Sequence, residues 1–388
     1  MSADTIIPPV SENRSIQKPG RDEAIMSVRD LTVAFEMDRG ASKVVNDVDV
    51  NIRDGEILGV VGESGSGKSM FASALLDAVE KPGQVTGDIT YYPPDGDPID
   101  VLNISKSELK RLRWEEISMV FQGALSSFNP TMTIRGHFEE TLQAHDVDRE
   151  AGMEQAEQLL SDLYLDPQRV LDSYPHELSG GMSQRALIAL SLVLEPSVLV
   201  MDEPTGALDL LMQRSILSLI DDVQSKYDLS IVFITHDLPL VAGLADRLAV
   251  LYAFEIVELG PAEEIVQRPG HPYTRSLLKA VPNLDAPLDT MQPIEGSAPH
   301  PADIPNGCTY ANRCSLATEE CLEEHPPFHD VDTNDDHFTA CYHWQEAREQ
   351  IPLKMEDTGE DESGDTAQSG AAESEDQTVV TLENTEVH

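Results

Sequence analysis

Residues 62–69 read GESGSGKS, and this stretch decides the fold. It matches the pattern G-x-x-x-x-G-K-[ST], in which glycines let the backbone wrap closely around a triphosphate. An apolar run at residues 57–61 precedes it and is of the kind buried in a parallel sheet. A helical stretch is predicted to follow over residues 71–79. Strand, loop and helix in this order predict an α/β fold with a nucleotide at the end of the strand, and we call residues 62–69 the phosphate loop.

The positions of the phosphate loop have distinct expected roles. Lys68 is expected to reach the β- and γ-phosphates of ATP, and the Ser69 hydroxyl is expected to ligate Mg²⁺. Backbone N–H groups and the positive end of the next helix would point at the anion. The loop residues predicted to contact ATP are Gly62, Ser64, Gly65, Gly67, Lys68 and Ser69.

A second apolar strand, residues 198–201, ends in two adjacent carboxylates. Asp202 is expected to hold the metal, directly or through water, and Glu203 to accept a proton from the attacking water. An Asp-Glu pair is common at strand ends, so the prediction depends on a third strand, residues 231–234, that leads to His236. His236 is expected to contact the γ-phosphate and orient the water; the alternative is an ordinary surface loop histidine.

Residues 178–185 read LSGGMSQR and resemble the LSGGQ-type signature of ABC ATPases, which other phosphate-loop enzymes lack. The resemblance implies a P-loop NTPase core of the ABC ATPase type that pairs head to tail with a second ABC ATPase subunit, identical or different. Ser179, Gly180 and Gly181 would then cover the γ-phosphate held by that second subunit. Two glycines allow close backbone approach, and the helix that follows adds its N-terminal dipole.

The same resemblance assigns three further residues. Gln122 matches the Q-loop glutamine, whose amide is expected to sense Mg²⁺ and to couple the site to membrane subunits. Asp209 matches the D-loop aspartate at the dimer interface. Phe35 sits where the family places an aromatic that stacks on adenine, with a core-facing strand phenylalanine as the alternative.

Two glycines depart from the usual pattern of the family. Gly123 stands where many relatives have an acidic residue, and Gly206 replaces a usual Ser or Thr. Neither change removes a catalytic group, but glycine adds backbone freedom and deletes a side-chain contact.

The chain divides into four predicted segments. They are a flexible N-terminal segment (1–23), the nucleotide-binding domain (24–264), a C-terminal module (265–348) and a disordered acidic tail (349–388). Within the domain, alternating apolar residues after Ala24 and a second strand around residues 44–50 predict an antiparallel β subdomain. Helix formers over about residues 123–188 predict a helical insertion.

Residues 270–278 read GHPYTRSLL and resemble the H-P-Y-T-R-x-L-L segment of the oligopeptide/dipeptide branch, which also includes nickel importers. By its residues alone this is a helix start, with Pro272 near the first turn and Leu277 and Leu278 on a packing face. The branch implies an ATPase that powers import of di- or oligopeptides from the cytoplasmic face of the membrane. Its implied partners are two membrane permease subunits and an extracytoplasmic substrate-binding protein. Nickel or another small solute is the alternative cargo, because the permease and the binding protein choose the substrate.

All four cysteines fall in one short segment, at Cys308, Cys314, Cys321 and Cys341. A secreted disulfide protein of this size would usually spread them, so metal is favoured. The segment resembles the C-terminal cysteine module of the same branch, in which some members hold a [4Fe-4S] cluster. The spacing lacks the paired C-x-x-C of zinc ribbons, so a cluster ranks ahead of zinc and of free thiols. Three nearby histidines, His325, His329 and His337, are expected to cap or pack loops, with a role as substitute ligands as the alternative.

The charge balance of 26 basic against 70 acidic residues gives a net charge of −44. Such a field repels phosphate backbones, so we expect no nucleic-acid partner. The acids are spread along the chain and lysine is scarce, which resembles proteins of halophilic organisms. The first residues lack the apolar core of a secretory signal. The longest apolar stretch, residues 186–194, is far short of the ~20 residues that span a bilayer.

Overall fold

The structure is a computed structural model that describes residues 24–37, 40–206, 208–280, 294–331 and 336–353. Described residues up to Leu353 belong to one compact unit. The predicted N-terminal segment, residues 1–23, and residues 354–388 of the predicted acidic tail lie outside the described residues. Residues 349 and 350, where the tail was predicted to begin, instead end a helix, α13 (Trp344–Gln350).

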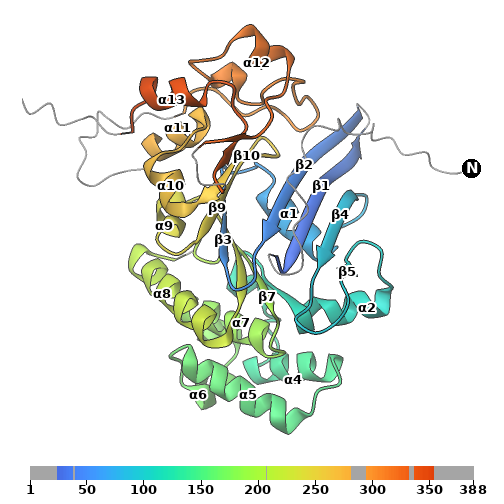
Figure 1. Cartoon of the computed structure of the whole chain (residues 1–388). Coiled ribbons are helices and arrows are strands. Elements are labelled where there is room, and N and C mark those ends of the chain that lie inside the picture. Colours follow the sequence, from blue (N-terminus) through green and yellow to red (C-terminus); the bar gives the residue numbers. More distant parts are fainter. Residues whose placement is uncertain (1–23, 38–39, 207, 281–293, 332–335, 354–388) are drawn as a thin grey trace, which may run out of the picture. The chain divides into compact units, whose positions relative to one another are not determined.

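An antiparallel sheet of four strands forms one layer of the molecule (Figure 1). Its strands are β1 (Met26–Met37), β2 (Gly40–Ile52), β4 (Gln84–Tyr91) and β5 (Ile99–Asp100), in the order β2-β1-β4-β5. Both strands predicted from the alternating apolar residues are present, and each pair is antiparallel. The apolar side chains of β1 and β2 are buried in a core that this sheet shares with α1 and with one face of the main sheet.

The second sheet has eight strands in the order β11-β12-β10-β9-β3-β8-β7-β6. Five of them run parallel: β3 (Ile57–Val61), β6 (Ile117–Val120), β7 (Val198–Asp202), β8 (Ser230–Thr235) and β9 (Arg247–Tyr252). Every residue of these five strands is buried, as the continuous apolar runs predict for strands covered on both faces. The predicted α/β core, with the phosphate loop after a buried parallel strand, is therefore confirmed.

Helix α1 (Lys68–Leu75) begins earlier and ends earlier than the prediction of residues 71–79. Gly67 is its N-cap, so the helix starts inside the phosphate loop itself. It ends at Leu75 because the chain turns back at Asp77, whose φ of 47° lies in the left-handed region. The apolar residues beyond Leu75 favour a helix in the sequence, but in the structure they lie in a loop and pack against the core.

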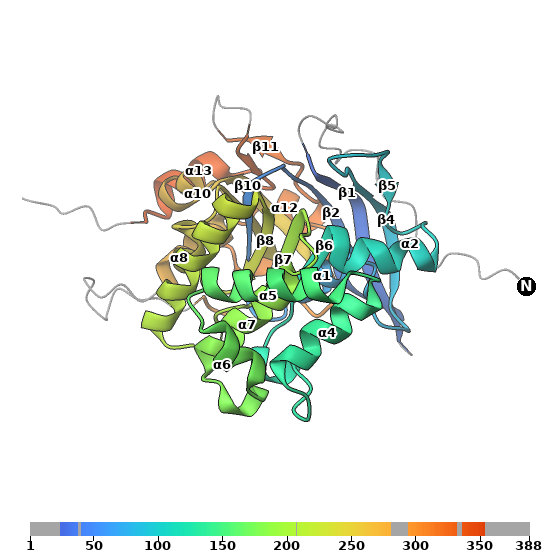
Figure 2. The ribbon, with the colours of Figure 1, turned by 90° about the horizontal axis from the view of Figure 1, so that it is seen from below.

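The predicted helical insertion is seen at the lower end of Figure 1 and from below in Figure 2. Its α-helices are α3 (Ala124–Ser127), α4 (Ile134–Ala144), α5 (Arg149–Asp162), α6 (Pro167–Asp172) and α7 (Gly180–Leu192), with a 3₁₀ turn at Pro175–Glu177. Side-chain oxygens of Thr133, Asp148, Asp166 and Ser179 cap the first turns of α4 to α7. Helix α7 is buried on nearly every side, which explains why it contains the longest apolar stretch of the sequence. In the described part of the chain, no helix has both the length and the apolar character needed to cross a bilayer.

The remaining helices of the domain flank the sheets. They are α2 (Lys106–Arg111), which leads into a π-helical turn at Leu112–Glu116, and α8 (Leu210–Tyr227), α9 (Leu238–Ala242) and α10 (Ala262–Gln267). Together with the strands, they place the carboxyl ends of β3, β6, β7 and β8 at one edge of the main sheet.

The C-terminal module adds strands to the main sheet. Its elements are α11 (Pro272–Ala280), a 3₁₀ turn (Ala311–Arg313), α12 (Glu319–Glu323), β11 (His329–Asp330), β12 (Phe338–Thr339) and α13 (Trp344–Gln350). Strand β12 pairs antiparallel with β10 (Glu255–Pro261), so the sheet continues into the module. The predicted helix start at Pro272 is confirmed, and Leu277 and Leu278 pack against the core.

Candidate functional site

The phosphate loop leaves β3 and closes into α1 through close backbone contacts. A Cβ atom at Gly62 would lie 2.1 Å from the carbonyl oxygen of Leu251, and one at Gly67 would lie 2.2 Å from that of Val44. Gly67 also has a φ of 103°, a left-handed conformation that side chains rarely adopt. The strand neighbours therefore require glycine at both positions, which fixes the curvature of the loop.

Lys68 lies buried at the start of α1 and points back over the loop. Its Nζ donates to the carbonyl oxygens of Gly62 and Glu63, each at 2.9 Å. Burial lowers the pKa of Lys68, while the negative charges of Glu203, Asp202 and Glu63 oppose that effect. An ammonium that rests on two carbonyl oxygens can be transferred to a phosphate at little cost, because an ionised phosphate accepts more strongly than a carbonyl.

Asp202 ends β7 directly behind the loop. Burial raises the pKa of its carboxyl, a hydrogen bond from Ser69 and the charge of Lys68 lower it, and the neighbouring charge of Glu203 raises it further. Its Oδ1 atom is buried and has no hydrogen-bond partner within the described residues. A carboxylate oxygen that lacks a partner, next to a serine hydroxyl, fits a hard divalent cation such as Mg²⁺.

Two residues from the ends of the strands on either side of β7 meet at Glu203. Gln122, just after β6, donates from Nε2 to Oε2 of Glu203 at 2.8 Å, and Nδ1 of His236, just after β8, lies 3.2 Å from Oε1. The backbone of Glu203 has a φ of 46°, and its N–H donates to the carbonyl of Ile234 at 2.9 Å. This left-handed residue turns the chain at the end of β7, so the side chain faces the two neighbouring strand ends.

A cavity of about 400 Å³ opens over the phosphate loop, within the size range of small-ligand sites. It is lined by Ser64, Gly65, Gly67, Lys68, Ser69, Gln122 and Glu203, together with Val44, Met70, Phe254 and Pro301. Phe35 is not among the lining residues; it packs, partly buried, against the core of the antiparallel sheet. Its predicted stacking on adenine remains a prediction.

Phe254 is a pocket residue that the sequence reasoning missed. It forms, with Ala253, the two-residue turn between β9 and β10, and both residues have positive φ values of 46° and 77°. Its N–H donates to the carbonyl of Ser66 at 3.1 Å, so the turn supports the phosphate loop. Such turns are usually signalled by Asn or Gly, and Ala-Phe carries no such signal.

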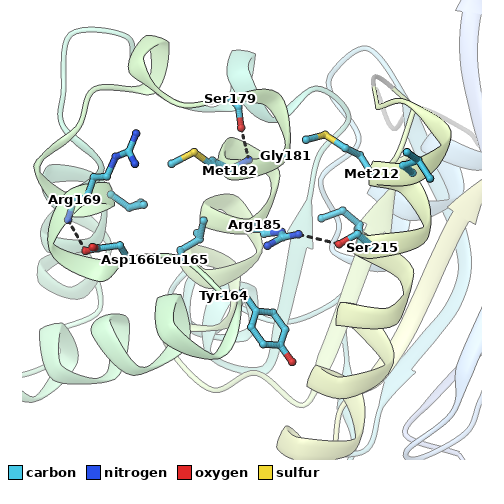
Figure 3. Close-up of a pocket in the computed structure, with 13 residues that line it drawn as sticks. Tyr164, Leu165, Asp166, Arg169, Ser179, Gly181, Met182, Arg185, Met212 and Ser215 are labelled. Carbon is cyan, nitrogen blue, oxygen red and sulfur yellow. Dashed lines mark hydrogen bonds between the residues drawn. The ribbon is translucent and has the colours of Figure 1, made fainter. Parts of the chain in front are cut away.

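The signature residues occupy the first turn of α7. The Ser179 hydroxyl caps the helix by accepting from the N–H of Met182 at 3.3 Å. Ser179 and Gly181 line a second cavity, of about 470 Å³, between the helical insertion and α8 (Figure 3). Across this cavity Arg185 donates to the Ser215 hydroxyl at 2.9 Å. None of Ser179, Gly180 and Gly181 lines the phosphate cavity of the same chain.

Asp209 begins α8 beside this second cavity. Its carboxylate caps the helix by accepting from the N–H of Met212 at 2.9 Å. The next two side chains, Leu210 and Leu211, are 73% and 80% exposed. Both leucines therefore present apolar side chains to the surface of a chain whose net charge is −44.

The two glycines that depart from the family pattern have different structural settings. Gly123 has a φ of 83°, and a Cβ there would lie 2.9 Å from Oγ of Ser126, so an acidic side chain would be strained. A Cβ at Gly206 would meet the nearest atom, Oε2 of Glu203, at 3.4 Å, an ordinary contact. The backbone at Gly123 thus requires glycine, whereas a Cβ at Gly206 would fit in ordinary contact with Glu203.

The four cysteines converge on one small cavity of about 10 Å³, which His271 and Tyr310 also line. None of the four forms a disulfide. Burial raises the pKa of Cys308 to about 12 and also raises the pKa values of Cys314 and Cys341. The N–H of Leu316 donates to Sγ of Cys314 at 3.4 Å, and that of His343 donates to Sγ of Cys341 at 3.3 Å. We call this site the thiol cavity.

The described side chains around the thiol cavity do not form a site for a single metal ion. Across the described ranges, no group of three or more His, Cys, Asp or Glu side chains could hold a metal ion. Two of the nearby histidines contact buried carboxylates: His337 lies 2.8 Å from Oε1 of Glu258, and His325 contacts Glu255. Four thiols on one cavity, two of them accepting backbone N–H groups, nevertheless match in number and kind the donors of an iron-sulfur cluster.

Comparison with known proteins gives consistent results along the chain. Residues 45–206 match the family model described as ABC transporter, and residues 257–321 match that of the oligopeptide/dipeptide transporter C-terminal region. The chain is 39% identical over 312 residues to the oligopeptide transport ATP-binding protein OppD of Escherichia coli, covering 79% of this chain and 91% of that protein. It is 36% identical over 332 residues to the dipeptide transport ATP-binding protein DppD of Caldanaerobacter subterraneus, covering 85% and 99%.

Solved structures show the same fold. The dimeric structure of MJ0796, a bacterial ABC transporter cassette, superposes with a TM-score of 0.53 at 25% identity. The match covers 61% of this chain and 98% of that cassette.

Proposed function

The chain belongs to the oligopeptide/dipeptide family of ABC transporter ATP-binding subunits, and from this premise we propose that it hydrolyses Mg-ATP to power import of di- or oligopeptides. The observation that carries the proposal is the meeting of Gln122 and His236 on the carboxylate of Glu203, at a phosphate loop whose Lys68 is free to move to a phosphate. The relatives printed as oligopeptide and dipeptide transport proteins support the choice of cargo.

The chemistry divides among residues that the fold brings together. Lys68 and the N–H groups of the loop would bind the β- and γ-phosphates, and Ser69 and Asp202 would hold Mg²⁺. When bound, the cation neutralises charge on the phosphates. Glu203 would take the proton of the attacking water. His236 and Gln122, which both contact its carboxylate, would orient the water at the γ-phosphate and sense Mg²⁺, respectively.

The assembly follows from the same family. We infer that a second ABC ATPase subunit supplies its signature to this chain's ATP, while Ser179, Gly180 and Gly181 serve the ATP of that subunit. Two permease subunits would hold the pair at the cytoplasmic face of the membrane, and an extracytoplasmic binding protein would deliver the cargo. On this proposal residues 24–264 form the nucleotide-binding domain and residues 265–348 the C-terminal module.

The test is ATP-driven uptake in liposomes that contain the cognate permeases, the second ATPase subunit and the binding protein. We expect labelled peptide to accumulate with Mg-ATP, and Lys68→Ala to abolish both hydrolysis and uptake. Lys106→Ala is the matched control, because Lys106 is exposed and far from the phosphate cavity. Uptake of nickel but not peptide would select the alternative cargo. Wild-type protein without magnesium-dependent ATP affinity would overturn the whole proposal.

We propose further that the thiol cavity holds a [4Fe-4S] cluster through Cys308, Cys314, Cys321 and Cys341. A cluster binds each thiolate to a different iron, so the thiols need to share a cavity rather than to surround one ion. Iron and sulfide in near-equal amounts after anaerobic purification are expected, and both should be lost in Cys314→Ser. Stoichiometric zinc would select the zinc alternative, and neither metal would select free thiols.

The charge of the chain supports a proposal about its environment. A net charge of −44 makes the folded state repel itself when few ions screen it, so we propose that the protein works at high salt. ATPase activity and circular dichroism should both decline on dialysis into dilute buffer. Full activity and an unchanged spectrum there would contradict the halophilic assignment.

A further inference from the structure

Glu63 of the phosphate loop is held by residues from the far end of the sequence. Its backbone N–H donates to the hydroxyl of Tyr273 at 2.9 Å. Its carboxylate accepts two bonds from Arg313, at 3.0 Å and 3.1 Å. Its carbonyl oxygen accepts from Nζ of Lys68 at 2.9 Å. Every polar group of Glu63 is therefore engaged, and two of the three engagements come from the C-terminal module.

Arg313 is anchored much more firmly than a surface arginine. Its side chain is only 6% exposed, and all five of its N–H groups have acceptors. Nε and one Nη donate to the carbonyl oxygens of Glu295 and Ile294, and the other Nη also donates to the hydroxyl of Tyr252. A two-bond pair with a carboxylate fixes orientation as well as distance.

An aromatic cluster joins the same residues to the thiol cavity. The rings of Tyr252, Tyr273 and Tyr310 lie with centroids 4.4 Å to 5.5 Å apart. The guanidinium of Arg313 lies over the rings of Tyr252 and Tyr310 at 5.6 Å and 5.8 Å. Tyr310 also lines the thiol cavity, and Cys314 is the next residue after Arg313. Continuous contacts thus run from the thiols to the phosphate loop.

We propose that Arg313 and Tyr273 are positioning residues of the ATP site, through which the C-terminal module sets the geometry of the phosphate loop. This inference rests on the proposed ATPase function. It adds that ATP binding depends on a segment outside the nucleotide-binding domain. Neither residue lines the phosphate cavity, so each acts only through Glu63. The carbonyl oxygen of Glu63 is one of the two that accept from Nζ of Lys68. A shift of Glu63 would therefore also shift the ammonium of Lys68.

The experiment compares steady-state ATPase kinetics and Mg-ATP binding of the assembled ATPase pair for four variants of this chain. In Arg313→Gln we expect the KM and the Kd for Mg-ATP to rise about tenfold while kcat changes little, since binding geometry is lost and the base is intact. Tyr273→Phe removes only the hydroxyl and should shift KM in the same direction by a smaller factor. Arg313→Lys should restore part of the affinity, because the charge remains but not the two-bond geometry.

Arg135→Gln is the matched control, since it breaks an Arg–carboxylate pair with Asp172 in the helical insertion, away from the phosphate loop. It should leave KM and Kd unchanged. Wild-type KM and Kd in a folded Arg313→Gln, or a loss of kcat alone, would overturn the proposal. If that variant does not fold, a Tyr273→Phe with wild-type KM and Kd would overturn it. A wild-type protein that binds no Mg-ATP would instead overturn the proposed function.

Discussion

Glu203 combines a strained backbone with a carboxylate bonded at both oxygens. Its φ of 46° is uncommon for a residue with a side chain, and Gln122 and His236 each contact one oxygen. Strain of this kind persists where neighbouring structure imposes it, here the bond from its N–H to the carbonyl of Ile234. Glu203 lines the phosphate cavity and Asp202 is buried, which supports the proposal that Glu203 is the base.

Glu203→Gln should lower the turnover of the assembled ATPase pair by about 10²–10⁴, the usual contribution of a general base. Affinity for Mg-ATP should persist, because glutamine keeps the size and the hydrogen-bonding oxygen of the side chain. Phosphate release and nucleotide binding measured on the same samples test this. Glu140→Gln, at an exposed position on α4, is the control and should turn over like wild type. Normal turnover in the Glu203 variant would remove that residue from the catalytic role.

Asp49 on β2 gives a pH-dependent prediction of stability. It is 4% exposed, and burial is the main reason that its pKa rises to about 6. An acid with a raised pKa in the folded state binds its proton more tightly when folded, so its contribution falls as pH climbs from about 4 to about 6. The free energy of unfolding of Asp49→Asn relative to wild type should therefore increase by about 3 kcal/mol between acid and neutral pH. Urea unfolding of both proteins across this range measures it, and a constant difference would contradict it.

At the scale of elements, α7 and α4 begin with the same kind of cap. Ser179 and Thr133 both cap helices, each accepting a backbone N–H at 3.3 Å, but only Ser179 belongs to the signature. Ser179→Ala and Thr133→Ala should each lower the free energy of unfolding by about 1 kcal/mol. Only Ser179→Ala should also slow ATP hydrolysis by the assembled pair, because its hydroxyl is proposed to face the partner's nucleotide. Equal ATPase rates for the two variants would show that Ser179 is only a cap.

The strands of the site were predictable because a buried parallel strand is a continuous apolar run. Residues 57–61, 198–201 and 231–234 carry that signal, and their neighbouring positions in the sheet bring Lys68, Glu203 and His236 together. A two-residue strand is too short to show an alternating pattern, so the pairing of β12 with β10 could not be predicted from the sequence. The same holds for contacts between distant positions, such as that of Arg313 with Glu63. Four nearby cysteines indicated a shared site, but only the fold shows that they face one cavity.

At the scale of the whole molecule, the main sheet joins the two predicted domains into one structure. Glu258 of β10 is fully buried and accepts from the N–H groups of Gly270 and His271 and contacts His337. A buried carboxylate that lost these partners would be strongly destabilising. The nucleotide-binding domain should therefore not retain its fold after the C-terminal module has unfolded.

The two tryptophans of the chain make this testable. Trp114 lies in the π-helical turn next to β6, at one edge of the main sheet, and Trp344 begins α13, beyond β12 near the other edge. Trp114→Phe and Trp344→Phe each leave a single fluorophore. Urea unfolding followed by fluorescence should give the same midpoint for both probes, and that of circular dichroism should coincide. Separate midpoints would show that the two segments unfold independently.

Salt should affect contacts through the two exposed leucines at the start of α8. Between two copies of an acidic cassette, electrostatic repulsion weakens as ions screen it, and salts that are excluded from protein surfaces strengthen apolar association. On the proposed pairing of two ATPase subunits, both changes would favour contact through the face that carries Leu210 and Leu211. Ionic strength would then regulate the pairing of the ATPase subunits. A fall in external osmolarity would weaken the pairing and so slow ATP hydrolysis, with no change in the residues of the catalytic site.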